Sequence, residues 1–258
     1  MKNTKKSTNT LRRLIHKNMK FKALVLFVIL LSSCSVAFNN TNNENIILAT
    51  EPIISKEISL EPFGGIQVNG FHNVTFIVSE EYSIAIEISE NIFELLDLDL
   101  NNLVERGVLN LPAFSPGYGL GVQWGSFIPK VYIYGPSNLQ SLSTGGSSDI
   151  YFSNTIYADN FLLTTSGFSN IELSIETEHL ELDASGSSNI TLGGSSNTTN
   201  ISSEGFSNIE APYFHTKYAN ITTSGSSNIY IYVSESLTTT QSGFSSVVNL
   251  GSASLFEE

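Results

Sequence analysis

Gly167-Phe-Ser-Asn-Ile171 returns in the sequence as Gly186-Ser-Ser-Asn-Ile190 and again as Gly205-Phe-Ser-Asn-Ile209. Six segments carry this pattern, and their first residues are Gly146, Gly167, Gly186, Gly205, Gly225 and Gly243. The glycines recur about every 20 residues, which is too short for a propeller blade or a helical hairpin but suits one coil of a β-solenoid. We therefore predict an all-β protein with a parallel β-solenoid, or β-helix, whose coils cover about residues 139–250.

Apolar residues keep fixed distances from each glycine. The fourth position after it holds Ile150, Ile171, Ile190, Ile209, Ile229 and Val247. The sixth position holds Phe152, Leu173, Leu192, Ala211, Ile231 and Asn249. Side chains two residues apart share one face of a strand, so stacked coils would join these rows into a continuous core. Asn249 breaks its row in the last coil, as expected where a solenoid ends.

Polar residues form further rows. The second position after each glycine is always Ser, and the third is Asp149, then four asparagines, then Ser246. Because an amide can donate to one neighbour and accept from another, we expect a structural ladder. Its members are Asn170, Asn189, Asn208 and Asn228. Asp149 is assigned to the first coil, with no matching residue before it.

The residue directly after each glycine alternates between Ser and Phe. The row reads Ser147, Phe168, Ser187, Phe206, Ser226 and Phe244. We hypothesise that each Phe fills room left by its small neighbours, so that Phe206→Ser would leave a void and lower stability. The pattern does not decide whether this row faces the core or the solvent.

Residues 51–135 also contain strand patterns. Apolar and polar residues alternate in Ile84-Ala-Ile-Glu-Ile88 and in Leu96-Asp-Leu-Asp-Leu100. The segment from Asn91 to Leu96 could form one short helical turn. We expect this region to be an irregular β-sheet that begins the same elongated structure and covers its first edge, which would otherwise be open to aggregation.

The N-terminus is typical of an exported lipoprotein. Basic residues precede the apolar run Ala23 to Leu31, which is too short to span a bilayer, so residues 1–33 are predicted to be a signal peptide. Met19 is a candidate for the true start. Leu31-Ser-Ser-Cys34 looks like a bacterial lipobox, so Cys34, the only cysteine, is the predicted lipid attachment site. Residues 34–50 are expected to be a lipidated, flexible polar tether.

The charge distribution excludes one class of partner. Residues 34–258 carry four Lys or Arg side chains and all 24 acidic ones, which gives a net charge of −20. Such a surface repels phosphate backbones, so no nucleic acid is expected as a partner.

Recognisable catalytic chemistry is absent from the sequence. The histidines that follow the signal peptide, His72, His179 and His215, lack the spacing of zinc ligands. No phosphate-binding loop or nucleophile elbow occurs. We therefore expect no catalytic residues, no metal and no cofactor, and a non-enzymatic protein. A polysaccharide-active β-helix enzyme remains the less favoured alternative, because the basic residues are isolated.

A family resemblance rests on several of these segments together. Phe63-Gly-Gly-Ile-Gln-Val-Asn-Gly-Phe-His-Asn-Val74, Ile86-Glu-Ile-Ser-Glu-Asn91, Val108-Leu-Asn-Leu111 and the coils resemble the "putative auto-transporter adhesin, head GIN domain" family. Its members are common lipoproteins of Bacteroidetes-type bacteria. The resemblance covers residues 51–250 as a head GIN domain, and implies a parallel β-solenoid with an irregular N-terminal sheet and no catalytic residues. Residues 251–258 are expected to be a C-terminal tail. The expected location is the outer membrane, with its periplasmic or surface face left open. The Gly- and aromatic-rich insert Phe114–Trp124 departs from the family pattern.

Two roles remain open from the sequence. The first is a binding or adhesion module for a glycan or an envelope protein, with Tyr118 and Trp124 as candidate ligand contacts on a loop. Exposed Tyr151, Tyr230 and Tyr232 could add aromatic stacking, although tyrosine is also an ordinary strand residue. The second role is a structural spacer in the envelope without a specific ligand. Either role includes attachment to the membrane through the lipid anchor.

Overall fold

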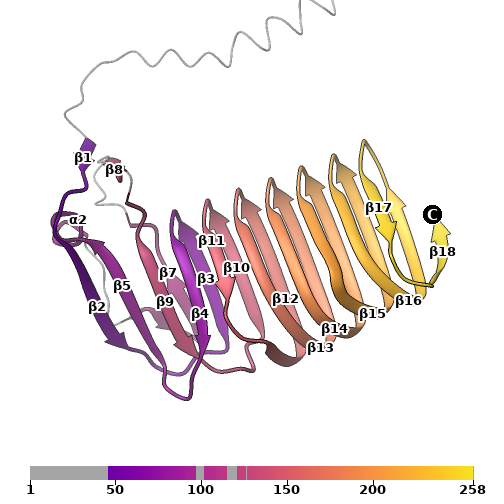
Figure 1. The fold of residues 1–258 in the computed structure, drawn as a ribbon, viewed down its shortest axis with the longest axis horizontal. Helices are drawn as coiled ribbons and strands as arrows, with labels where there is room; N and C mark the ends of the chain where they lie inside the picture. The colour runs from indigo at the N-terminus through magenta and orange to yellow at the C-terminus, as the bar shows by residue number, and fades with distance from the viewer. Residues whose placement is uncertain (1–45, 97–101, 115–120, 126, 258) are drawn as a thin grey trace, which may run out of the picture. The chain divides into compact units, whose positions relative to one another are not determined.

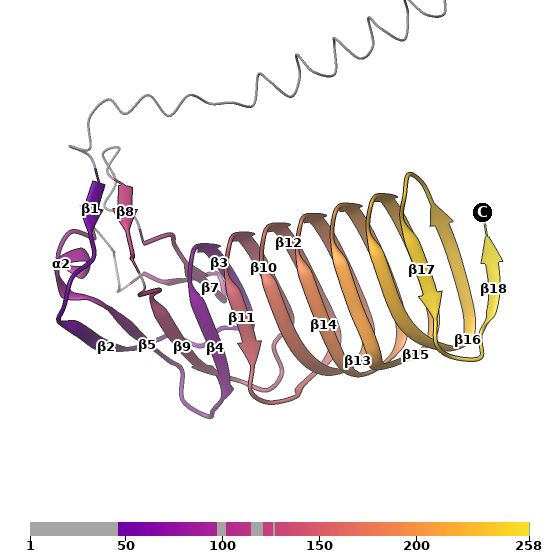
Figure 2. The same cartoon turned by 45° about the horizontal axis from the view of Figure 1, so that its top comes forward.

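The computed structural model describes residues 46–96, 102–114, 121–125 and 127–257, and most of them form strands that stack into coils (Figure 1). The predicted all-β fold, a parallel solenoid preceded by an irregular sheet, is confirmed (Figure 2). Five long strands, each bending round a coil, make up most of the solenoid. They are β12 (Ile156–Gly167), β13 (Asn170–Gly186), β14 (Asn189–Gly205), β15 (Asn208–Gly225) and β16 (Asn228–Gln241).

Equivalent residues of neighbouring coils lie opposite each other in parallel register. Between β13 and β14, Ile171 pairs with Ile190, and Gly186 with Gly205. The isoleucines four positions after each corner glycine are buried, as predicted: Ile150, Ile171, Ile190, Ile209 and Ile229. The β15–β16 register shifts between Ala211 and His215, and Tyr213 in this segment is 79% exposed.

The solenoid begins one coil earlier than the sequence predicted. Gly146 lies opposite Gly70, and Asp149 lies opposite Asn73. The assignment of Asp149 to the first coil, with no residue before it, is therefore wrong. The extra coil consists of β3 (Gly65–Gly70) and β4 (Asn73–Val78), which pair with β10 (Ser141–Gly146) and β11 (Asp149–Phe152). A long excursion of the chain separates this coil from the next in the sequence, so Gly70 and Gly146 do not show the 20-residue spacing of the later glycines.

That excursion, together with β2 (Ile53–Ser59) from before the first coil, covers the first coil, as expected. On one side β9 (Lys130–Gly135) pairs in parallel with β4, then β5 (Ser83–Ser89) and β2 follow antiparallel. On the other side β7 (Val108–Leu111) pairs in parallel with β3, and β6 (Val104–Glu105) pairs with β7. The predicted helical turn is α2 (Glu90–Phe93).

Short strands complete the described part. At the N-terminal end, β1 (Ile46–Leu48) pairs in parallel with β8 (Gly121–Gln123). At the C-terminal end, β17 (Ser246–Asn249) and β18 (Ser254–Glu257) both pair with β16. None of the helices formed by the described residues has the length and apolar character needed to cross a membrane.

Candidate binding surfaces

The three described histidines, His72, His179 and His215, contact different partners. His179 is hydrogen-bonded to the Thr198 hydroxyl, and the His215 ring lies 4.4 Å from that of Tyr232. Within the described ranges, no three His, Cys, Asp or Glu side chains are grouped so that they could hold a metal ion.

His72 is a buried structural residue. It follows Gly70 by two positions and so occupies, in the first coil, the place that Ser148 takes in the second. Its Nε2 lies 3.0 Å from the carbonyl oxygens of both Asn69 and Pro112, and its ring lies 4.3 Å from Phe114. Burial lowers the pKa of His72 below its ordinary value, so the folded chain favours the neutral ring.

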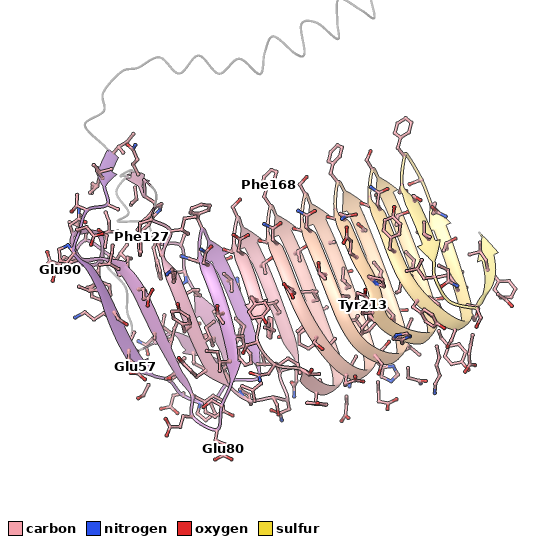
Figure 3. The ribbon with its side chains drawn as sticks, viewed as in Figure 1. Glu57, Glu80, Glu90, Phe127, Phe168 and Tyr213 are labelled. Atoms are coloured by element: carbon pink, nitrogen blue, oxygen red, sulfur yellow. The ribbon has the colours of Figure 1, made fainter. Side chains whose placement is uncertain are left out.

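A row of exposed phenylalanines runs along the corners of the solenoid. We call Phe71, Phe168, Phe206 and Phe244 the Phe ridge, and these side chains are 45%, 70%, 71% and 91% exposed. Phe168 stands at the edge of the stack in Figure 3. The hypothesis that Phe206 packs between its small neighbours is therefore wrong. The residue after each corner glycine points outward, whereas the serine that follows it in the second to sixth coils is buried.

The Phe ridge has a regular period. Its members belong to the first, third, fifth and seventh coils, and serines occupy the same position in the coils between. Since neighbouring strands lie about 4.8 Å apart, the rings recur about every 9.6 Å. Single aromatic residues scattered over a surface need no special explanation, whereas a regular exposed row of them indicates an interaction surface.

An apolar groove lies at the N-terminal end of the Phe ridge. Phe71, Phe114, Trp124 and Phe168 line it, together with Ser147, around a volume of about 490 Å³. Trp124 follows β8 directly and is half-buried there. The structure thus places one predicted contact residue, Trp124, against the ridge. The other, Tyr118, lies outside the described residues, as does Cys34.

A larger and more polar hollow lies over the middle coils. It has a volume of about 1000 Å³ and is lined by Asn138, by Gln140 and by residues of β12, β13, β14 and β15. Among its side chains are Tyr157, Asp159, Glu176, Glu178, His179 and Lys217. Tyr157 is 58% exposed. Carboxylates, hydroxyls and an aromatic ring on one rigid surface can hydrogen-bond and stack against a polyhydroxylated ligand.

The asparagines of the row lie opposite one another, but not every side chain donates to its neighbour in the row. The Asn170 amide donates to an Asp149 carboxylate oxygen at 2.6 Å, and that of Asn189 donates to Asn170 Oδ1 at 2.9 Å. The Asn208 amide instead donates to Glu210 of its own strand at 3.1 Å. Asn228 lies opposite Asn208 in the β15–β16 pair.

The tyrosines suggested for stacking do not form one platform. Tyr151 and Tyr230 share a row and are 45% and 43% exposed, but Glu172, Thr191 and Glu210 lie between them. Tyr232 contacts the His215 ring.

Sequence reasoning missed both the direction of the Phe ridge and the polar hollow. The first had a usable signal, because Phe71 follows Gly70 and continues the Phe–Ser alternation by one coil. The hollow had none, because its side chains come from positions far from the repeated glycine.

Comparison with known proteins gives a family and a fold. The model of the family described as "Putative auto-transporter adhesin, head GIN domain" matches residues 62–253. No curated protein matches the sequence.

Solved structures of similar fold include three from Bacteroides and Parabacteroides species. A "putative adhesin" from Bacteroides fragilis is 19% identical with a TM-score of 0.68, and the match covers 82% of this chain and 100% of that one. A "putative adhesin" from Parabacteroides distasonis is 16% identical with a TM-score of 0.58, covering 83% and 100%. A "putative lipid binding protein" from the same species is 18% identical with a TM-score of 0.56, covering 83% and 99%. At these identities the likeness concerns the fold.

Proposed function

We propose that this chain, which belongs to the "Putative auto-transporter adhesin, head GIN domain" family, is a lipid-anchored envelope protein whose solenoid is a non-catalytic binding module for glycans. The family description supports an adhesive role, and the lipobox-like Leu31-Ser-Ser-Cys34 supports the anchor. The stacked coils supply a rigid scaffold on which a ligand surface is held in a fixed shape.

The polar hollow is the observation that carries the glycan proposal. Residues of five successive coils, from Gln140 to Lys217, line it over a length of about 19 Å, which suits an extended ligand better than a small compact one. Asp159, Glu176 and Glu178 supply acceptors for sugar hydroxyls, and exposed Tyr157 supplies a stacking face. Its acidic side chains favour neutral or basic sugars over sulfated or uronic ones.

A glycan array probed with the full chain tests this proposal. We expect binding that Tyr157→Ala abolishes, because the stacking face is lost. Tyr230→Ala is the matched control, since Tyr230 is also an exposed strand tyrosine but lies outside the hollow. If neither wild-type protein nor variants bind glycans or envelope extracts, the alternative role as a structural spacer is favoured.

Membrane fractionation tests the anchor separately. Cys34→Ser removes the thiol that lipidation requires, so we expect this variant to leave the membrane fraction. Its retention there after a high-salt wash would contradict lipid attachment through Cys34.

A further inference from the structure

We propose that the Phe ridge rests on the surface of a phospholipid bilayer and holds the anchored solenoid along the membrane. The inference rests on the lipid anchor of the proposed function and is independent of glycan binding. Phe168, Phe206 and Phe244 are at least 70% exposed, and aromatic side chains gain free energy when they enter the boundary between headgroups and acyl chains. The ridge spans six coil spacings, or about 29 Å.

The charge around the ridge favours this contact. From the residue before each corner glycine to the third residue after it, the seven corners contain two acids, Asp149 and Glu204, and no Lys or Arg. The remaining 22 acids lie elsewhere. A bilayer with anionic headgroups would repel most of the domain's surface, whereas this edge can approach it at little electrostatic cost.

The short sequence distance from Cys34 to the described domain also points to this edge. The described chain begins at Ile46 in β1, which pairs with β8, and Trp124 directly after β8 lies in the apolar groove with Phe168. Figures 1 and 2 show β1 next to β8, so the described chain begins near the groove at the end of the Phe ridge. Eleven residues separate Cys34 from Ile46, so a lipidated Cys34 keeps this edge within about 40 Å of the bilayer.

The residues near that entry point are apolar as well. Ile46 and Leu48 of β1 are 53% and 54% exposed. Together with the groove, they extend the apolar edge to the first described residues of the chain. A second copy of the chain could also interleave its phenylalanines with the ridge, because rings about 4.8 Å apart stack well. We favour the bilayer because two domains of net charge −20 repel each other and the anchor already brings this edge to the membrane.

Trp124 provides a probe for the test, since it is the only tryptophan in the chain and lies in the groove beside Phe168. Full-length lipidated protein is reconstituted into phosphatidylcholine vesicles whose acyl chains carry bromine near the headgroup. We expect bromine to quench the emission of Trp124. A triple variant, Phe168→Ser, Phe206→Ser and Phe244→Ser, should lose most of this quenching while remaining attached through Cys34.

The substitutions are chosen to leave the fold intact. Serine already occupies the same position in alternate coils, and the replaced rings are mainly exposed, so equal thermal unfolding of variant and wild type is expected. Phe71 is kept, so that one of the two ridge phenylalanines that line the groove with Trp124 remains in the variant. Tyr213→Ser is the matched control, since Tyr213 is equally exposed but lies away from the ridge (Figure 3). This variant should be quenched like the wild type.

Three results would overturn the inference, each for a different reason. Vesicle-bound wild-type protein with unquenched Trp124 would show that the ridge faces away from the lipid, and would leave the anchor intact. Wild-type protein missing from the vesicles would remove the anchor on which this inference rests, and would leave glycan binding to its own test. A dimer in analytical ultracentrifugation that the triple variant abolishes would assign the ridge to a second copy.

Discussion

At the scale of single residues, the corner glycines make the closest contacts between coils. Gly186 has a φ of +101°, and a Cβ built on it would lie 2.5 Å from the carbonyl oxygen of Gly167. We expect Gly186→Ala to lower the unfolding free energy by at least about 2 kcal/mol, because both the backbone conformation and the contact oppose a side chain. Chemical denaturation measures this loss.

Gly107→Ala separates the two causes. Gly107 also has a positive φ, +77°, but a Cβ there would meet nothing within 4 Å. Gly107→Ala should therefore lower the unfolding free energy only through the strained backbone conformation, by about 1 kcal/mol. Equal losses for the two variants would show that the contact between stacked corners contributes nothing.

His72 should make stability depend on pH. Burial lowers its pKa in the folded chain, whereas the unfolded chain keeps a value near 6.5. Below that pH the unfolded state binds a proton that the folded state does not, so stability falls as the pH decreases toward the folded pKa. We expect the melting temperature of His72→Gln to change less between pH 7 and pH 5 than that of the wild type.

Glutamine suits this comparison because its amide can still donate to the Asn69 and Pro112 carbonyls but does not titrate in this range. Carboxylates that titrate in both proteins cancel in the difference between them. Parallel pH profiles for wild type and His72→Gln would contradict the assignment of this effect to His72.

At the scale of elements, the row of asparagines limits where a charge is tolerated. The Asn170 amide donates to Asp149 at 2.6 Å, so Asn170→Asp replaces this bond with two facing carboxylates. We expect a loss of about 1 kcal/mol that high salt partly restores, because like charges directly opposite on neighbouring strands repel. Denaturation at low and high salt measures both effects.

Asn228→Asp is the control for this prediction. Asn228 lies between Asn208 and Ser246, which are both uncharged. The new carboxylate therefore meets no like charge in its row, and its cost should be smaller and less sensitive to salt. An equal, salt-independent loss at both positions would mean that asparagine is required there for another reason.

The repeated elements could be predicted from the sequence because one row of residues has one environment in every coil. The isoleucine row became the core for this reason, and the β13–β14 register follows the alignment of the glycines. The first coil was not predicted, because strands inserted between β3 and β10 break the 20-residue spacing of the glycines. Its pairing with β10 is therefore visible only in the structure. His72 in place of serine obscured it further.

The candidate surfaces were less accessible to sequence reasoning. Strand alternation assigns faces within a regular strand, but Phe168 and Phe206 lie at corners, where the backbone turns and alternation gives no direction. Trp124 reaches the groove through the pairing of β1 with β8, two short strands that no repeat marks.

At the scale of the whole molecule, a stack of coils is stabilised mainly by contacts between neighbours, so its two ends are its weakest points. The first coil is covered by β9, β5 and β2. At the other end, Asn249 interrupts an apolar row, and its side-chain amide makes hydrogen bonds to backbone groups. Its Oδ1 accepts hydrogen bonds from the amides of Val233 and Gly251 at 2.9 Å, and its Nδ2 donates to the Val233 carbonyl.

Asn249→Ala should therefore loosen the C-terminal end without loosening the middle of the stack. Loss of the Asn249 side chain leaves the Val233 amide and carbonyl without these hydrogen-bond partners, which should lower the unfolding free energy by about 1–2 kcal/mol. In hydrogen exchange, we expect the amides of β16 to exchange faster, while those of β13 keep their wild-type rates. Asn220→Ala is the control, since the Asn220 side chain donates to that of Asn200. Equal acceleration along all coils would show that the stack unfolds as one unit, and that Asn249 stabilises it globally rather than at its end.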